Sequence, residues 1–177
     1  MKTQNYQLKP QDIVLLLKLV VDNNPTWNQK PISAALCMSQ SEISQAVSRC
    51  KFAGLLSPDG KTVMKNNLFD LLQYGIRFIF AQHPGPVVRG IPTSHSVDPL
   101  RSEIQSDELF VWPYANGTAR GHSIAPLYPS VPAAAMKDSA LHEILALVDA
   151  LRVGRSREKD LALIHLKERF DYGKQNH

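Results

Sequence analysis

Apolar residues recur in the first part of the chain at the three- and four-residue spacing of amphipathic helices. The first stripe, over residues 13–20, predicts a largely buried helix that begins near Pro10 and ends before Pro25. Residues 1–7 precede this helix, and their composition is typical of a loose tail.

Residues 31–56 have the pattern of two short helices joined by a tight turn. Apolar positions on the first helix are Ile32, Ala35 and Leu36, and those on the second are Ile43, Ala46, Val47, Cys50 and Ala53. Ser39 and Glu42 have the spacing of a capping box, so we expect the second helix to begin at Gln40. Gly54 is expected to end it.

The outward face of this second helix, over residues 40–53, is polar without the mixture of long acidic and basic side chains that a solvated helix usually carries. We expect this face to hold Gln40, Ser41, Ser44, Gln45, Ser48, Arg49 and Lys51. Serine and glutamine can hydrogen-bond base edges or phosphates, and arginine can bind guanine through two hydrogen bonds. The pattern therefore favours a helix that enters the major groove of DNA.

Ile43-Ser-Gln-Ala-Val-Ser-Arg-Cys-Lys-Phe-Ala-Gly-Leu55 resembles the recognition helix of MarR-like winged helix-turn-helix regulators. Those families have apolar, Ser-Arg and apolar positions in this order and end in Ala-Gly-Leu. The resemblance covers about residues 8–80 and implies a winged helix-turn-helix fold and binding to double-stranded DNA.

A turn signature at Ser57-Pro-Asp-Gly-Lys61, between two short apolar runs, predicts a β-hairpin that would form the wing. Lys61 and Lys65 would then lie beside the DNA backbone, although two solvated lysines are an equally good interpretation. MarR-like wings often carry an arginine for the minor groove, and this one has none.

The chain divides into three parts, with boundaries at residues 83 and 138, and the whole is predicted to be mainly α. Residues 8–82 form the winged helix-turn-helix domain and end in a helix over 68–81 that is apolar on more than one side. Residues 83–137 hold eight of the twelve prolines together with large apolar residues, and we expect an ordered, irregular segment there. Within it, 108–112 and 119–124 could pair as strands around Asn116-Gly117.

Residues 138–172 predict two helices, one over 141–153 after a cap at Asp138 or Ser139, and one over 156–170. Their apolar stripes look larger than one small helical domain can cover. We therefore expect this region to bind a second copy of the chain, because dimeric readers bind twofold half-sites of DNA.

The net charge of +4 is unevenly distributed along the chain. Residues 1–65 hold eight Lys and Arg against four acids, whereas residues 66–177 hold twelve of each. The excess lies with the suspected DNA-reading helix, as a phosphate-binding surface requires. The chain has no run of 18 apolar residues and no signal-peptide pattern at its start, so we expect a cytoplasmic protein with no membrane partner.

No motif of an enzyme or of a cofactor site occurs: there is no phosphate loop, zinc spacing or nucleophile elbow, and no catalytic residue, metal or cofactor is expected. Cys37 and Cys50 are interpreted as small core residues, with a redox switch as the alternative. His83, His95 and His122 have neighbours typical of loops, and a metal site is the weaker interpretation. For Arg152, Arg155 and Arg157, local ion pairing is favoured over phosphate binding.

Two functions remain. The first is a sequence-specific DNA-binding transcriptional regulator, expected to be a dimeric repressor that reads the major groove with helix 40–53. The second is an antitoxin-like or defence-system module whose proline-rich segment and last helices bind and mask a partner protein. Binding of DNA by the purified chain alone would separate the first from the second.

Overall fold

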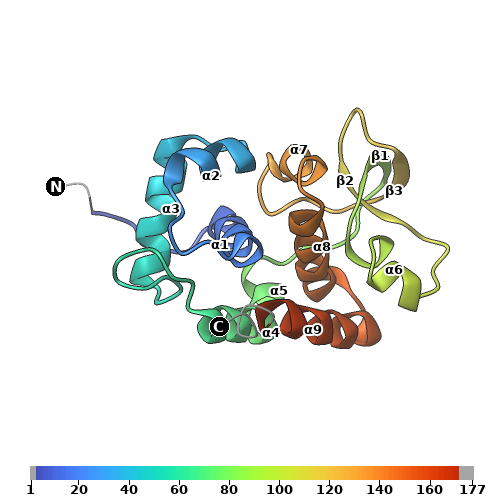
Figure 1. The fold of residues 1–177 in the computed structure, drawn as a ribbon. Coiled ribbons are helices and arrows are strands. Elements are labelled where there is room, and N and C mark those ends of the chain that lie inside the picture. Colours follow the sequence, from blue (N-terminus) through green and yellow to red (C-terminus); the bar gives the residue numbers. More distant parts are fainter. Residues whose placement is uncertain (1–2, 172–177) are drawn as a thin grey trace.

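The computed structural model describes residues 3–171, which form an α-rich fold with one small sheet (Figure 1). Helices contain 54% of these described residues. The first three are α1 (Pro10–Asp22), α2 (Gln29–Leu36) and α3 (Gln40–Phe52), and α1 packs against both of the others. Residues 11–20 of α1 are all buried, so the predicted first helix is confirmed.

A short hairpin follows α3. Leu56 and Val63 form an isolated antiparallel bridge, and the Ser57 N–H donates to the Thr62 carbonyl at 2.8 Å. Gly60 has a φ of +75°, which a residue with a side chain rarely adopts, and this lets the chain reverse. The predicted hairpin is present, but its ladder is reduced to one bridge.

The helix predicted over 68–81 is two helices, α4 (Lys65–Tyr74) and α5 (Ile76–Ile79). They meet at Gly75, whose φ of −122° and ψ of −35° interrupt α4. Leu68, Leu72 and Ile76 are buried on one side of this pair, whereas Tyr74, Phe78 and Ile79 remain exposed. The two apolar sides noted in the sequence therefore have different surroundings.

The proline-rich segment contains a three-stranded sheet of β1 (Val87–Pro92), β2 (Phe110–Pro113) and β3 (Ala119–Ser123). β1 pairs antiparallel with both other strands, and β2 and β3 pair in parallel, so the three strands close on one another. The expected pairing of 108–112 with 119–124 as a hairpin around Asn116-Gly117 is wrong in direction. β1 crosses β2 so closely at Gly90 that a Cβ there would lie 1.9 Å from the Trp112 carbonyl oxygen.

Three short helices complete this segment: the 3₁₀ helix η1 (Ser94–Ser96), α6 (Leu100–Glu103) and α7 (Val131–Met136). Of the regular elements in residues 83–137, the sequence predicted only strands near β2 and β3, whereas β1, η1, α6 and α7 were missed. Prolines at the ends of β1 and β2 and near the start of α7 explain this, because they mark element ends as readily as loops.

The last two helices are α8 (Ser139–Val153), capped by the Asp138 side chain, and α9 (Ser156–Asp171). α8 runs through the middle of the molecule and contacts α1, α4, α5, α7 and α9 (Figure 1). Residues 144–151 are buried, as are Ala162, Leu166 and Phe170 of α9. The argument for a dimer from uncovered stripes is therefore wrong, since most of that surface is covered within one chain. Tyr172, the last residue of the expected region 138–172, lies outside the described residues.

Candidate nucleic-acid interface

α3 begins where the sequence predicted, but only half of the predicted capping box forms, because the Glu42 carboxylate accepts from Gln11 and Arg49. The Ser39 side chain accepts a hydrogen bond from the Glu42 N–H at 3.1 Å, and α3 begins at Gln40. Ile43, Ala46 and Cys50 are buried against the helices beside them. This packing turns the opposite side of α3 toward solvent.

The solvent-facing side of α3 holds six of the seven predicted residues, namely Gln40, Ser41, Ser44, Gln45 and Lys51, which are exposed, and Ser48, which is half-buried. Gln45 Nε2 donates to Ser41 Oγ at 3.2 Å, and Ser48 Oγ donates to the Ser44 carbonyl at 3.2 Å. These neutral bonds at the surface can be exchanged for bonds to a ligand at small cost. We call Ser41, Ser44, Gln45 and Ser48 the polar face of α3.

Arg49 does not belong to this face, and the prediction that it points outward is wrong. Its side chain is only 4% exposed and donates to Asp12 of α1 through both Nε and Nη2, each at 2.8 Å from an Asp12 oxygen. Nη2 also donates to Glu42 Oε1 at 2.9 Å. The hydrogen bonds with Asp12 raise the pKa of Arg49. Seven residues separate Arg49 from Glu42, which places both on the flank of α3 that faces α1.

Glu42, the acid of α3, is drawn to the same flank. Gln11 Nε2 donates to Glu42 Oε1 at 2.9 Å, in addition to the bond from Arg49. Burial opposes ionisation here, but the hydrogen bonds from Gln11 and Arg49 prevail and lower the pKa of Glu42. The polar face of α3 is therefore left without a carboxylate of its own helix.

The hairpin lysine, Lys61, lies against Trp27. Its ammonium donates to the Trp27 carbonyl at 2.7 Å and lies 5.0 Å from the centre of the indole ring, while Trp27 Nε1 donates to the Lys61 carbonyl at 2.9 Å. Trp27 itself is 4% exposed. These contacts fix the hairpin to the loop before α2.

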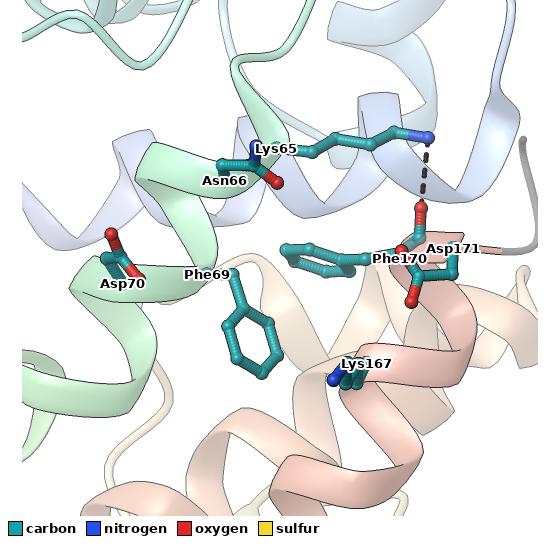
Figure 2. Close-up of a pocket in the computed structure, with 7 residues that line it drawn as sticks. All are labelled: Lys65, Asn66, Phe69, Asp70, Lys167, Phe170 and Asp171. Carbon is teal, nitrogen blue, oxygen red and sulfur yellow. Dashed lines mark hydrogen bonds between the residues drawn. The ribbon is translucent and has the colours of Figure 1, made fainter.

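Lys65, at the start of α4, reaches across to α9, as Figure 2 shows. Its ammonium donates to the Phe170 carbonyl at 3.3 Å above a pocket of about 170 Å³. Two lysines and two aspartates line this pocket, so its charge favours neither sign of ligand. Lys61 is thus held by the loop before α2, and Lys65 by the end of α9.

Residues 1–7 were expected to be a loose tail, but the part of them that the structure describes lies beside α3, as does Lys9. Tyr6 stacks on Phe52, with ring centres 4.3 Å apart and planes 9° apart. Gln4, Asn5, Tyr6 and Lys9 line a groove together with residues of the polar face. Tyr6 is the one aromatic residue of residues 3–9, and a single aromatic residue near the start of a chain is a weak signal of a site.

The two cysteines have unlike surroundings. Cys50 is buried, and burial raises the pKa of its thiol, so it is an inert core residue as interpreted. Cys37 is exposed at the end of α2, where Lys137 Nζ lies 3.2 Å from its sulfur, so its interpretation as a core residue is wrong.

The three histidines considered as metal ligands have different surroundings. Of the three histidines, His83 is exposed, His95 buried and His122 half-buried. In the part of the chain that the structure describes, no group of three or more His, Cys, Asp or Glu could hold a metal ion.

Arg152 pairs with Asp149 at 2.8 Å, which confirms local ion pairing for this residue. Over residues 3–171, no helix is both long and apolar enough to cross a membrane.

Comparisons of this chain with protein-family models, with curated proteins and with solved structures found no match. The resemblance to MarR-like regulators therefore depends on the sequence alone, chiefly on the motif of residues 43–55.

Proposed function

We propose that this protein is a winged helix-turn-helix regulator of transcription that binds double-stranded DNA, with α3 in the major groove and the hairpin over residues 55–64 as the wing. The major groove is about 12 Å wide, which admits one α-helix. In this arrangement α1 supports α3 from the side opposite to the DNA.

The observation that carries the proposal is the polar face of α3. Its hydroxyls and amide recur at helical spacing from Ser41 to Ser48, they are accessible, and Glu42 is drawn away from them by Gln11 and Arg49. Carboxylates repel the DNA backbone, so their absence from this face of α3 favours an anionic partner.

In the proposed complex, Ser41, Ser44 and Gln45 contact base edges, and Gln45 has the two-hydrogen-bond geometry that suits adenine. Lys51, near the end of α3, contacts phosphate. Arg49 is a positioning residue, because its charge is already paired with Asp12 and Glu42. Lys61 and Lys65 are assigned no base contact.

The test is the affinity of Gln45→Ala for duplex DNA from upstream of the protein's own gene and for duplexes selected from a random pool by the parent. Losing a two-hydrogen-bond contact to adenine should cost about 1–3 kcal/mol at one base pair. Gln73→Ala, on α4, is the matched control and should bind as the parent does. Equal affinity of Gln45→Ala and parent on every base would rule out α3 as the reader, and a parent that binds no duplex would refute the proposal.

One observation favours the second candidate, a module that binds a partner protein. Tyr74, Phe78 and Ile79 lie within six residues of chain and are 68%, 71% and 52% exposed. Exposed apolar clusters of this kind often mark protein interfaces. Co-purification of a neighbour-encoded protein with the parent, lost in the double variant Tyr74→Ser/Phe78→Ser, would support this candidate if the parent also fails to bind DNA.

A further inference from the structure

A groove of about 440 Å³ runs between the N-terminal stretch and the polar face of α3. Gln4, Asn5, Tyr6 and Lys9 line one wall of this groove. Ser44, Gln45, Ser48 and Arg49 line the other. We call residues 3–9 the arm.

The arm is held along α3 by an aromatic contact and by its own hydrogen bonds. Tyr6 stacks on Phe52, which occupies the same side of α3 as Ser41, Gln45 and Ser48 because these positions are three or four residues apart. The Tyr6 hydroxyl donates to Gln4 Oε1 at 2.7 Å, and the Gln7 N–H donates to Asn5 Oδ1 at 2.9 Å. These bonds fold the arm locally, so that it passes along the helix that is proposed to read DNA.

The residues that line the groove favour an anion. They comprise two cationic side chains, three amides, two serines and one tyrosine, and no carboxylate is among them. Two other hollows combine basic side chains with carboxylates. Asp70 and Asp171 line the pocket beside Lys65, and Glu108 and Glu158 line a hollow that also contains Arg155. Arg49 adds no positive charge to the groove, because the cluster that it forms with Asp12 and Glu42 has a formal net charge of −1. Lys9 is therefore the cation that the groove offers a ligand.

We infer that the groove between the arm and α3 binds the phosphodiester backbone of a DNA strand, so that the arm and the helix hold the same duplex. The inference rests on the proposed function, to which it adds a second DNA-binding element. Amides and hydroxyls donate to phosphate oxygens, and Lys9 supplies the charge. A backbone contact beside the base-reading residues sets the depth and direction at which α3 enters the major groove.

The experiment measures the affinity of Lys9→Gln and Tyr6→Ala for the duplexes selected by the parent, at several salt concentrations. If Lys9 neutralises one phosphate, Lys9→Gln should lower the slope of log affinity against log salt by about 0.9. Tyr6→Ala should weaken binding by about 2- to 10-fold, the range that one aromatic stacking contact contributes. Lys167→Gln on α9 and Tyr74→Ala on α4 are the matched controls and should change neither quantity. Circular dichroism of each variant reports that the fold is kept.

Other results would overturn the inference. If Gln45→Ala weakens binding while Lys9→Gln and Tyr6→Ala equal the parent, the arm does not bind DNA and the proposed function stands. If Tyr6→Ala binds more tightly than the parent, the arm covers α3 rather than assisting it. Inorganic phosphate could shift the backbone NMR signals of Ser44 and Ser48 in the parent but not in Lys9→Gln. If this occurs while Lys9→Gln binds DNA as the parent does, the ligand of the groove is a small anion. A parent that binds no duplex refutes the proposed function and this inference together.

Discussion

Two buried clusters, each built on one arginine and one aspartate, differ in what they hold together. Arg49 and Asp12 join α3 to α1, and Arg152 and Asp149 lie one helical turn apart on α8. Both pairs have a contact of 2.8 Å, and all four side chains are at most 5% exposed. The two pairs are thus alike in burial and in shortest contact, although Arg49 binds Asp12 through two nitrogens and Arg152 binds Asp149 through one.

The other partners of the two clusters differ in charge. The Arg49 cluster consists mostly of charges, with Glu42 as the second acid and Gln11 as its amide donor. In the Arg152 cluster the remaining partners are neutral. Asp149 Oδ2 accepts from Thr93 Oγ1 and Trp112 Nε1, each at 2.7 Å, and Arg152 donates to the Phe80 and Ala125 carbonyls at 2.9 and 3.1 Å. The first cluster therefore sets the position of one helix, and the second joins the small sheet, the end of α5 and a loop to the central helix.

The largest effect is expected for Asp149→Ala. This change leaves Arg152, Thr93 and Trp112 without their shared buried acceptor, and removing one member of a buried ion pair costs about 3–5 kcal/mol. Urea unfolding monitored by circular dichroism measures the loss. Asp107→Ala, at an exposed position, should stay within about 0.5 kcal/mol of the parent. A loss below about 1 kcal/mol for Asp149→Ala would mean that the cluster does not join these segments.

Asp12→Ala should cost somewhat less, about 3 kcal/mol, because Glu42 still pairs with Arg49. The comparison is sharpened by replacing both partners with apolar residues. Asp12→Leu/Arg49→Met should regain most of the stability, since few neutral groups depend on that pair. Asp149→Leu/Arg152→Met should regain little, because Thr93, Trp112 and two backbone carbonyls remain without their partners. Similar recovery of both double variants in urea unfolding would contradict the distinction.

The same two clusters show what local sequence patterns can predict. Helix bounds followed from periodicity and capping, since α1, α3, α8 and α9 begin and end within about two residues of expectation. Arg49 was misplaced because the pattern that assigned it outward considered α3 alone. Its direction is set by Asp12, which lies 37 residues away in sequence.

Long-range contacts also explain the other misses. β1 contains Gly90 and ends at Pro92, and both residues are typical of loops when only the local sequence is considered. Gly90 is required by the close crossing with β2. The stripe on α8 suggested a dimer because nothing local shows that α1, α4, α5, α7 and α9 surround it. Of the candidate site, the polar face of α3 was predictable from helical spacing, but the arm was not, because its position depends on one stacking contact with Phe52.

A smaller change in stability is expected for Glu42 of the Arg49 cluster, and this change should depend on pH. Hydrogen bonds from Gln11 and Arg49 outweigh burial and hold the pKa of Glu42 below its ordinary value of 4.5. A lowered pKa in the folded state stabilises the protein above the unfolded-state pKa, and this stabilisation is lost as the pH falls through the folded-state pKa. Glu42→Gln should therefore cost about 1 kcal/mol at neutral pH, a value reduced for partial exposure. The difference from the parent should shrink below about pH 4.5.

Urea midpoints between pH 7 and pH 3 measure this difference. Asp138, whose pKa is lowered by hydrogen bonds from Lys18 and Leu141 against the effect of burial, adds a separate loss of stability in acid. Glu42→Gln should therefore keep part of the acid dependence of the parent. A difference between Glu42→Gln and parent that stays constant over this range would show that Glu42 does not act through its charge.

The smallest expected change is in the rate at which the Cys50 thiol is labelled. This rate reports whether the Arg49 cluster opens locally, without unfolding of the whole molecule. Its sulfur lies 4.0 Å from the Asp12 carbonyl, and its buried thiol can react with a thiol reagent only after α3 separates from α1. If this opening is local and fast, the labelling rate follows the open population, and a loss of about 1 kcal/mol in Glu42→Gln should raise the rate roughly fivefold. Thr93→Val removes one hydrogen bond to Asp149 and should cost a similar amount of global stability, yet leave Cys50 labelling unchanged. Exposed Cys37 serves as an internal standard, because it should react at the same rate in all variants. Equal acceleration of Cys50 labelling by both substitutions would mean that the molecule opens only as a whole, and the two clusters would then act as one cooperative unit.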